Sequence, residues 1–369
     1  MNRLPMLTDC AGPCRAAGPG RAAFTPRQLD PGAAPPQHCT SPLFAVPMPP
    51  TPAPAEPAVA LRARPLLAGL LATRPAFLGV TLFACLIGLA VAHGSGLPID
   101  GLKAGLTVFF ALVAHAGINV LNDYYDARSG ADAANTERLF PFTGGSRFIQ
   151  NGVLSEAETG RLGYALLALV VPAGLWLAVQ SAPGLILIGL VGLFLGWAYT
   201  APPLALVARG LGELAVAAGW LIVVIGSDFV QRGAFSATPV IAGLSYALLV
   251  AAILFINEFP DRRGDEAAGK RTLVVRLGPE NAKWAYLGLV LLAYGWLVLM
   301  VGRDRLPQGA AAAALTLILS FRASRDLMAH ASEPSELAPA LKLTIAAANL
   351  HGLVLAAALA FGRWPGVLS

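Results

Sequence analysis

The chain has few charged residues for its length. Charged side chains make up 13% of its 369 residues, hydrophobic residues make up 56%, and the mean hydropathy is +0.64. Soluble proteins carry about 25% charged residues, so the composition excludes a soluble domain and predicts a membrane protein. The net charge of +5 is spread between apolar runs and forms no basic stripe with interleaved aromatic residues, which excludes a nucleic-acid-binding protein.

Cysteine is also scarce. Cys10, Cys14, Cys39 and Cys85 have no second set of ligands at a metal-binding spacing, so no zinc site or disulfide framework follows from them. Residues 1–60 are rich in Pro, Ala and Gly and lack the apolar run of a secretory signal peptide. We therefore expect residues 1–60 to be a disordered tail that includes an alternative start at Met48, and residues 61–369 to form the membrane domain.

Apolar segments recur from residue 76 onward. Most are close to the ~20 residues that a bilayer-spanning helix needs. They lie at 76–93, 102–121, 161–180, 183–199, 211–228, 238–257, 283–301, 308–321 and 343–361. The sequence therefore predicts an all-α, polytopic membrane protein with about nine transmembrane helices; eight or ten are the alternatives, because the eighth segment is short.

Lys and Arg residues concentrate in alternate loops. The loop after the second expected helix contains Arg128, Arg138 and Arg147, and the loop after the sixth contains five Lys or Arg residues. Each loop expected on the other side contains at most two. Because such residues favour the cytoplasm, we expect both basic loops to face the cytoplasm, in the bacterial inner membrane.

Two acidic motifs follow these same helices. "NDYYD" begins at Asn122 and "NEFPD" begins at Asn257, and both read Asn, acid, aromatic, any residue, Asp. Residues four apart share a helix face, so Asn122 converges with Asp126, and Asn257 converges with Asp261 and Asp265. Two such faces offer the hard oxygen ligands that Mg²⁺ prefers, which predicts a magnesium site for a diphosphate. The matching registers favour this hypothesis over two solvated acidic loops.

Three blocks resemble those of the UbiA superfamily of intramembrane prenyltransferases: "NDYYDARSGAD", "YTAPPLALVARGLGE" and "NEFPDRRGDEAAGKRTLVVRLG". The resemblance implies nine transmembrane helices around a central cavity, with both motifs binding Mg²⁺ and an isoprenyl diphosphate. The "GAD" ending and "GKRTLVVRLG" are most similar to the 1,4-dihydroxy-2-naphthoate polyprenyltransferases of menaquinone biosynthesis. Glu258 departs from the double asparagine of that branch, which keeps 4-hydroxybenzoate, the ubiquinone precursor, open as an alternative acceptor.

The resemblance also implies roles for individual residues. Metal-bound carboxylates would neutralise the diphosphate as it leaves, and the residues expected to act in this way are Asp123, Asp126, Asp261 and Asp265, with Asp132 as a further metal ligand. Substrate contacts are expected from Asn119, Asn122, Asn257, Arg147, Arg209, Lys270, Arg271 and Tyr124.

Several of these residues have structural alternatives. Arg209 and Glu213 orient the acceptor, or Glu213 only complements the dipole of the helix that begins there. Tyr124 belongs to a membrane interface, where aromatic residues are common without binding a substrate. His115 is either a proton acceptor or, as we favour, a hydrogen-bonded packing residue.

Two other function classes are compatible with acidic residues in a membrane protein. A membrane phosphatidyltransferase requires a "DGxxAR" stretch, which this sequence lacks. A cation-coupled transporter would place its acids near the middle of the membrane, whereas these lie at helix ends. The expected partners are therefore an isoprenyl diphosphate, an aromatic acceptor and the lipid bilayer, with no nucleic acid and no obligate protein partner.

Overall fold

The computed structural model describes residues 55–364, which contain α- and 3₁₀-helices and no β-strand. Most of the expected tail, residues 1–60, therefore lies outside the described residues. The longer helices are α2 (Gly79–Gly94), α3 (Gly101–Ser129), α5 (Glu156–Gln180), α6 (Gly184–Thr200), α7 (Gly212–Arg232), α8 (Thr238–Ala267), α10 (Pro279–Gly302), α11 (Leu317–His330) and α12 (Ala338–Phe361). The shorter ones are η1 (Val59–Ala63), α1 (Pro65–Ala72), η2 (Pro75–Phe77), α4 (Ala131–Ala134), η3 (Leu206–Arg209), α9 (Leu273–Leu277), η4 (Gln308–Thr316) and η5 (Pro334–Glu336).

Six helices of the described part are long and apolar enough to cross a membrane: α3, α5, α7, α8, α10 and α12. The segment from α1 through α2 is a seventh candidate, bent by 60°. Helix α6 has only 17 residues, and the eighth expected segment is divided between η4 and α11. The all-α polytopic fold is thus confirmed, while the count of nine spans is not.

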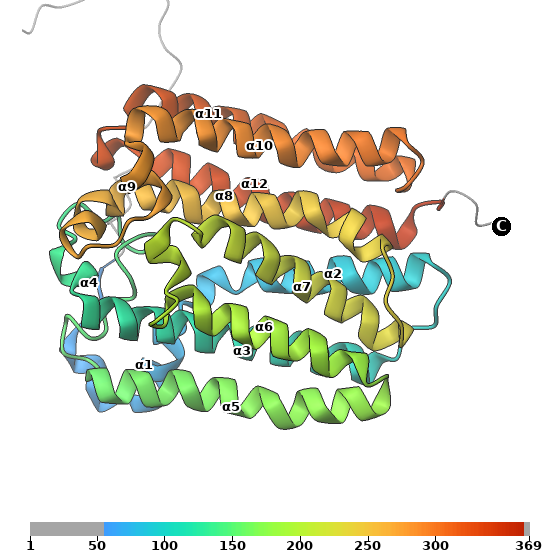
Figure 1. The fold of residues 1–369 in the computed structure, drawn as a ribbon, viewed down its shortest axis with the longest axis horizontal. Helices are drawn as coiled ribbons and strands as arrows, with labels where there is room; N and C mark the ends of the chain where they lie inside the picture. Colours follow the sequence, from blue (N-terminus) through green and yellow to red (C-terminus); the bar gives the residue numbers. More distant parts are fainter. Residues whose placement is uncertain (1–54, 365–369) are drawn as a thin grey trace, which may run out of the picture. The chain divides into compact units, whose positions relative to one another are not determined.

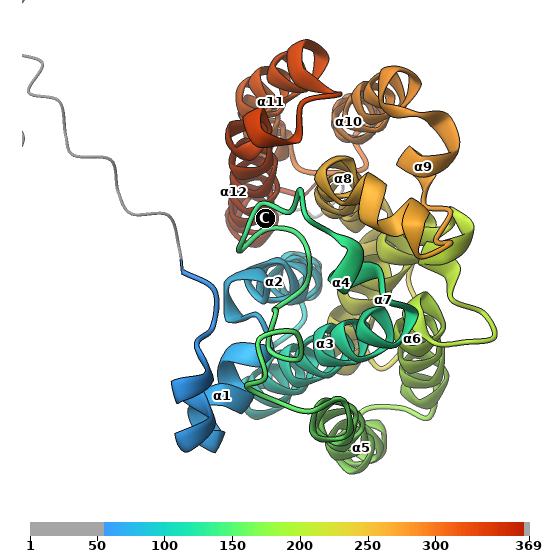
Figure 2. The ribbon, with the colours of Figure 1, turned by 90° about the vertical axis from the view of Figure 1, so that its left-hand side faces the viewer.

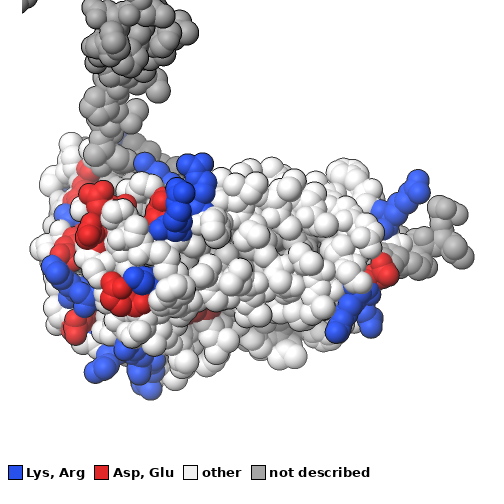
Figure 3. Space-filling view, turned by 90° about the horizontal axis from the view of Figure 1, so that it is seen from above, with Lys and Arg blue, Asp and Glu red and all other residues white. Residues whose placement is uncertain are grey.

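The long helices run side by side between two ends of the bundle (Figure 1). Helices α3 and α8 both finish at the end that carries α4 and α9, which we call the cap end (Figure 2). On the face seen in Figure 3, Lys, Arg, Asp and Glu gather at the two ends and leave an uncharged belt between them. An uncharged belt of this kind matches the apolar interior of a bilayer.

Helix α8 lies at the centre of the packing. It contacts α7, α10, α12 and α2, and its inward residues belong to the largest apolar cluster of the described part. Tyr246 of this helix is fully buried, and its hydroxyl donates a hydrogen bond of 2.6 Å to the carbonyl oxygen of Val80 on α2. A buried hydroxyl needs such a partner, because no water is available to it. The contacts fix α8 firmly, and with it the acidic motif at its end.

Candidate active site

The two acidic motifs meet at the cap end through Lys270, which lies between α8 and α9. Its Nζ atom is 3.1 Å from Asp126 Oδ1 on α3 and 3.1 Å from Asp265 Oδ1 on α8. Asn122 donates a hydrogen bond of 3.1 Å to the other oxygen of Asp126, as the four-residue spacing predicts. One lysine thus joins the carboxylates of both motifs.

A loop over residues 135–155, which we call the cap loop, covers the remaining carboxylates. The N–H of Ser146 donates to both oxygens of Asp123 at 3.2 Å. The N–H of Gly144 donates to Asp261 at 3.3 Å, and the side-chain amide of Asn135 donates to the other oxygen of Asp261. Backbone N–H groups stabilise buried carboxylates, so the cap loop holds Asp123 and Asp261 in place.

Two consecutive glycines allow this approach. Gly144 and Gly145 have φ of +76° and +73°, a region that other residues rarely adopt. A Cβ atom on Gly145 would lie 2.6 Å from Asp132 Oδ2 and 3.1 Å from Asp123 Oδ1. Only glycine therefore leaves room for two carboxylates beside this backbone.

Asp132 of α4 is 5% exposed and lies among other carboxylates. Burial, and then the charges of Asp126 and Asp123, raise the pKa of Asp132 to about 8. Gln150 donates a hydrogen bond of 3.2 Å to its Oδ2 atom, and Arg147 donates one of 2.5 Å to its backbone oxygen. Arg147 thus contacts the acidic cluster at the backbone of Asp132 and does not line the cavity at the cap end.

Lys270 is the cation placed among these acids. Burial disfavours its charge, but the carboxylates of Asp126 and Asp265 more than offset this effect and hold the pKa of Lys270 well above its usual value. The amine is therefore charged at neutral pH. A charged amine held in a polar, buried place is expected of a group that binds phosphate oxygens.

The donor atoms at the cap end fit Mg²⁺. Within residues 55–364 no three His, Cys, Asp or Glu side chains stand ready as a metal cluster, and Lys270 separates Asp126 from Asp265. The available donors are carboxylate and amide oxygens, the ligands that Mg²⁺ takes. Asn135 Oδ1 and Asn257 Oδ1 are buried without a hydrogen-bond partner, so both oxygen atoms are available as metal ligands.

A cavity of about 480 Å³ begins at these carboxylates and continues into the bundle. Asp126, Asp132, Asp261 and Asp265 line its cap end together with Asn119, Asn122, Asn257 and Lys270. Farther in, the walls of the cavity are mostly apolar. The cavity extends to Leu177, Leu185 and Val230, which lie at the ends of α5, α6 and α7 that are farthest from the cap end. A charged head group and a long apolar tail would both find matching surroundings here.

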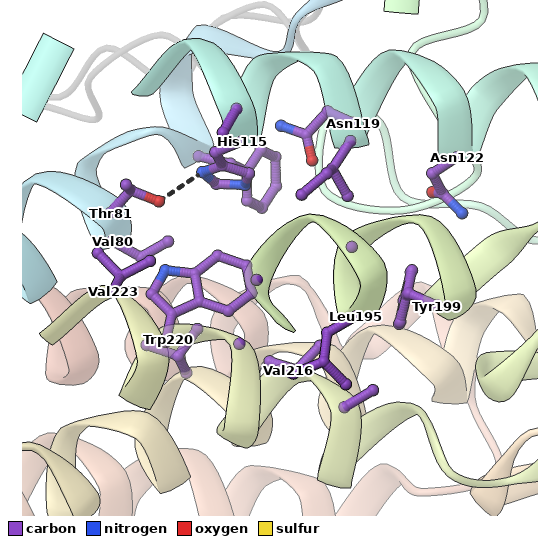
Figure 4. A pocket seen from close by; sticks show the side chains of 18 of the residues that line it. Val80, Thr81, His115, Asn119, Asn122, Leu195, Tyr199, Val216, Trp220 and Val223 are labelled. Atoms are coloured by element: carbon purple, nitrogen blue, oxygen red, sulfur yellow. Dashed lines mark hydrogen bonds between the residues drawn. The ribbon is translucent and has the colours of Figure 1, made fainter. Parts of the chain in front are cut away.

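His115 of α3 and Trp220 of α7 line the cavity, farther in than the polar residues of the cap end (Figure 4). The two rings are edge-to-face with their centroids 5.0 Å apart, and His115 Nδ1 is 2.8 Å from the hydroxyl of Thr81. His115 is thus a hydrogen-bonded residue that also faces the cavity. Asn119 and Asn122 follow it along α3 toward the cap end, opposite Tyr199 of α6.

Four expected substrate contacts are not brought to the cavity: Arg147, described above, and Tyr124, Arg209 and Arg271. Tyr124 faces α5, where its ring lies close to Gly160, and its hydroxyl accepts a hydrogen bond of 2.8 Å from Arg128. Arg209 and Arg271 are exposed and do not line the cavity. Asp123 does not line it either, although it touches the cap loop that does.

Some residues at the site were not predicted from the sequence. Arg74 lines the cavity at a left-handed backbone position, and Asn135 and Gly144 contact Asp261. The signal that could have revealed the cap loop is "TGGSR", a pair of glycines between two acidic motifs. Arg74 follows no comparable pattern, because only the packing of α1 and α2 brings it to α3.

Comparison with known proteins identifies the fold and the enzyme class. Residues 81–345 match the UbiA prenyltransferase family. The chain belongs to this family. A UbiA homologue of Archaeoglobus fulgidus bound to DMAPP and Mg²⁺ has the same fold, with a TM-score of 0.52 and 19% identity, covering 78% of this chain and 99% of the homologue.

Individual UbiA relatives point to one branch. A 1,4-dihydroxy-2-naphthoate octaprenyltransferase of Mycobacterium tuberculosis is 32% identical over 71% of this chain and 86% of its own length. The enzyme of that name from Bacillus subtilis is 28% identical over 62% of this chain and 72% of its own length. The predictions of a membrane prenyltransferase and of similarity to the menaquinone branch are therefore confirmed.

Proposed function

We propose that this UbiA prenyltransferase transfers a polyprenyl chain from an isoprenyl diphosphate to 1,4-dihydroxy-2-naphthoate, the reaction of menaquinone biosynthesis. The observation that carries the proposal is the meeting of two acidic motifs and one buried lysine at the polar end of a long apolar cavity. The names of the similar octaprenyltransferases support the acceptor. 4-Hydroxybenzoate is the second candidate.

The polar end binds the diphosphate. Lys270 points at the space between α3 and α8 and pairs with phosphate oxygens when the substrate enters. Asp126, Asp132, Asp261 and Asp265 would hold Mg²⁺ there together with the amide oxygens of Asn135 and Asn257, and the ion would supply positive charge that stabilises the departing diphosphate. Asp123 positions the cap loop through Ser146 and is the weakest candidate for direct metal contact.

The apolar part of the cavity holds the tail and protects the reaction. Cleavage of the allylic C–O bond leaves a carbocation that water would capture. The lining by apolar side chains such as Ile118, Leu195 and Val216 excludes water from that position. With water excluded, the ring of the acceptor is the nucleophile that reacts with the carbocation. We further propose that the cap end faces the cytoplasm of a bacterial inner membrane.

The test is a product assay on membranes that contain the protein. A labelled isoprenyl diphosphate and Mg²⁺ are offered with either dihydroxynaphthoate or 4-hydroxybenzoate, and products are identified by mass. We expect a prenylated naphthoquinol. Product from hydroxybenzoate alone would move the protein to ubiquinone synthesis, and no product from either acceptor would refute both candidates.

The carboxylates are tested in the same assay. Asp126→Asn and Asp261→Asn each remove one negative charge without a change in volume, so we expect turnover to fall at least about 100-fold while the protein stays folded. Asp304→Asn, at the opposite end of the bundle, is the matched control and keeps its activity. Wild-type rates in both cap-end variants would refute the proposed site.

A further inference from the structure

A segment ahead of α2 lies against the cap loop. It spans residues 55–72 and includes η1 and α1, and we call it the strap. Glu56 of the strap accepts a hydrogen bond of 2.8 Å from Arg138 Nε at its Oε1 atom. Its Oε2 atom accepts a hydrogen bond of 3.1 Å from the side-chain amide of Asn151. One carboxylate thus ties two separate residues of the cap loop to the strap.

Apolar packing supports the same contact. Phe148 and Val153 of the cap loop form a buried cluster with Ala68 and Ala72 of α1. Burial of apolar surface does not depend on the charge of Glu56, so we expect the strap to stay docked when that charge is removed. A substitution of Glu56 therefore tests its ion pairs without releasing the whole strap.

Arg138 connects Glu56 to the second acidic motif. Its Nη1 atom donates a hydrogen bond of 2.8 Å to the backbone oxygen of Asn135, whose side-chain amide donates to Asp261. Arg138 also lies against Gly144, where an added Cβ atom would be 2.6 Å from Arg138 Cβ. The N–H of Gly144 is the other cap-loop donor to Asp261 described above. Both residues that hold the Asp261 carboxylate therefore touch Arg138.

Arg147 connects Glu56 to Asp132. Its Nε atom is 3.8 Å from Glu56 Oε2, and its Nη1 atom donates to the backbone oxygen of Asp132. The Nε atom is buried and makes no hydrogen bond within residues 55–364, so this ion pair is its polar contact there. The strap thus reaches acids that follow the first motif as well as the second.

The ion pairs of Glu56 form a network that is partly shielded from water. The side chains of Glu56 and Arg138 are 28% and 25% exposed, and that of Arg147 is 9% exposed. A single exposed pair contributes little to stability, whereas short charge-assisted hydrogen bonds in a partly buried network contribute more. Removal of the carboxylate would leave two neighbouring guanidinium groups without the acid that they share.

We propose that Glu56 is a positioning residue, which holds the cap loop closed over Asp132 and Asp261 so that the diphosphate site is formed before the substrate arrives. The strap precedes residues 81–345, so the match to the UbiA family does not include it. The inference rests on the proposed function for its effect on catalysis. A cap loop that is closed only part of the time lowers the apparent affinity for the substrate by that fraction, because binding must first close it. Once the substrate is bound, the loop is closed and the rate of transfer is unchanged.

The first test measures the cap loop without substrate. Hydrogen exchange of the full chain in detergent and EDTA is followed by mass spectrometry. In Glu56→Gln, which keeps the side-chain size but not the charge, we expect the amides of the cap loop to exchange about tenfold faster or more. Exchange in α10 stays as in the wild type, which shows that the bundle is folded. Glu280→Gln, which removes a glutamate from an exposed ion pair with Lys283, is the control and leaves cap-loop exchange unchanged.

The second test is kinetic, with Mg²⁺, geranylgeranyl diphosphate and dihydroxynaphthoate. In Glu56→Gln we expect the KM for geranylgeranyl diphosphate to rise about fivefold or more, while kcat stays within about twofold. Arg138→Gln should raise the KM at least as much. Addition of Glu56→Gln to Arg138→Gln should then raise it by about threefold at most, because the two residues act through one contact.

The outcomes separate this inference from the proposed function. Cap-loop exchange within about twofold of the wild type in Glu56→Gln, or a fall in kcat with an unchanged KM, would overturn the inference and leave the proposed function standing. Absence of product in the wild type would refute the proposed function, and the exchange measurement alone would then decide whether Glu56 holds the cap loop.

Discussion

Lys270 shows how strongly one residue depends on residues distant in the sequence. It is 11% exposed and makes ion pairs with two carboxylates, one of them 144 residues away. Removal of one partner from such a cluster leaves uncompensated charge in a buried place. The lysine is therefore a structural element as well as the proposed phosphate ligand.

This dual role predicts a magnesium-dependent stability. Lys270→Met keeps the side-chain length but leaves Asp126 and Asp265 facing each other, which we expect to lower stability by about 3–5 kcal/mol in EDTA. Mg²⁺ can replace the missing charge, so it should raise the melting temperature of this variant more than that of the wild type. Thermal unfolding in detergent, with EDTA or Mg²⁺, measures both effects.

A lysine in an exposed ion pair provides the comparison. Lys283 pairs with Glu280, whose side chain is 66% exposed, so Lys283→Met should change stability by about 1 kcal/mol at most. Equal melting temperatures of the Lys270 and Lys283 variants in EDTA would contradict the role assigned to Lys270.

At the residue scale, spacing predicted the motif acids but not the direction of every side chain. The four-residue register of Asn122 and Asp126 is a property of the helix itself and was predictable. Tyr124 was expected at the substrate, but its position on α3 turns it toward α5. Which face of α3 meets the cavity depends on where its neighbours pack, and no local pattern contains that information.

Close approach between helices is decided by small residues. Gly88 of α2 lies against α7 so closely that an added Cβ atom would collide with the backbone oxygen of Val224. A backbone atom cannot rotate away as the end of a side chain can. The crossing of α2 and α7 therefore requires glycine at this position.

We expect Gly88→Ala to destabilise the protein by about 1–3 kcal/mol, because α2 must move away from α7. Gly288→Ala on α10 is the matched control, since an added Cβ atom there meets nothing within 4 Å. It should be neutral or stabilising by up to about 1 kcal/mol, as alanine favours the helix. Thermal unfolding in detergent of both variants checks this, and equal losses would show that packing at Gly88 is not the cause.

At the scale of elements, the apolar segments located the long helices well and their ends less well. The segment expected at 238–257 is part of α8, which continues to Ala267 because the acidic motif is itself helical. The segment expected at 343–361 belongs to α12, which begins five residues earlier at Ala338. Hydropathy detects the membrane-buried part of a helix, whereas polar extensions at its ends are set by caps and neighbours.

The molecule as a whole has two charged ends, and the distribution of Lys and Arg predicts which faces the cytoplasm (Figure 3). In a background whose four native cysteines are replaced by alanine, Ala157→Cys marks the cap end and Ala234→Cys marks the opposite end; both positions are exposed. We expect a membrane-impermeant thiol reagent to label Ala234→Cys in intact spheroplasts, and Ala157→Cys only after permeabilisation. Labelling in the reverse pattern would contradict the proposed orientation.

The sequence by itself determined the membrane location, the all-α class, the helix ends that carry the two acidic motifs and the resemblance to the UbiA superfamily. These features depend on composition and on spacings of a few residues, which act locally. Only the tertiary structure decided that Lys270 stands between Asp126 and Asp265, and that a glycine pair lets the cap loop reach the acids. The contacts of Lys270 with Asp126 and of Gly144 with Asp261 join segments far apart in the chain, and their meeting follows from how the helices pack against one another.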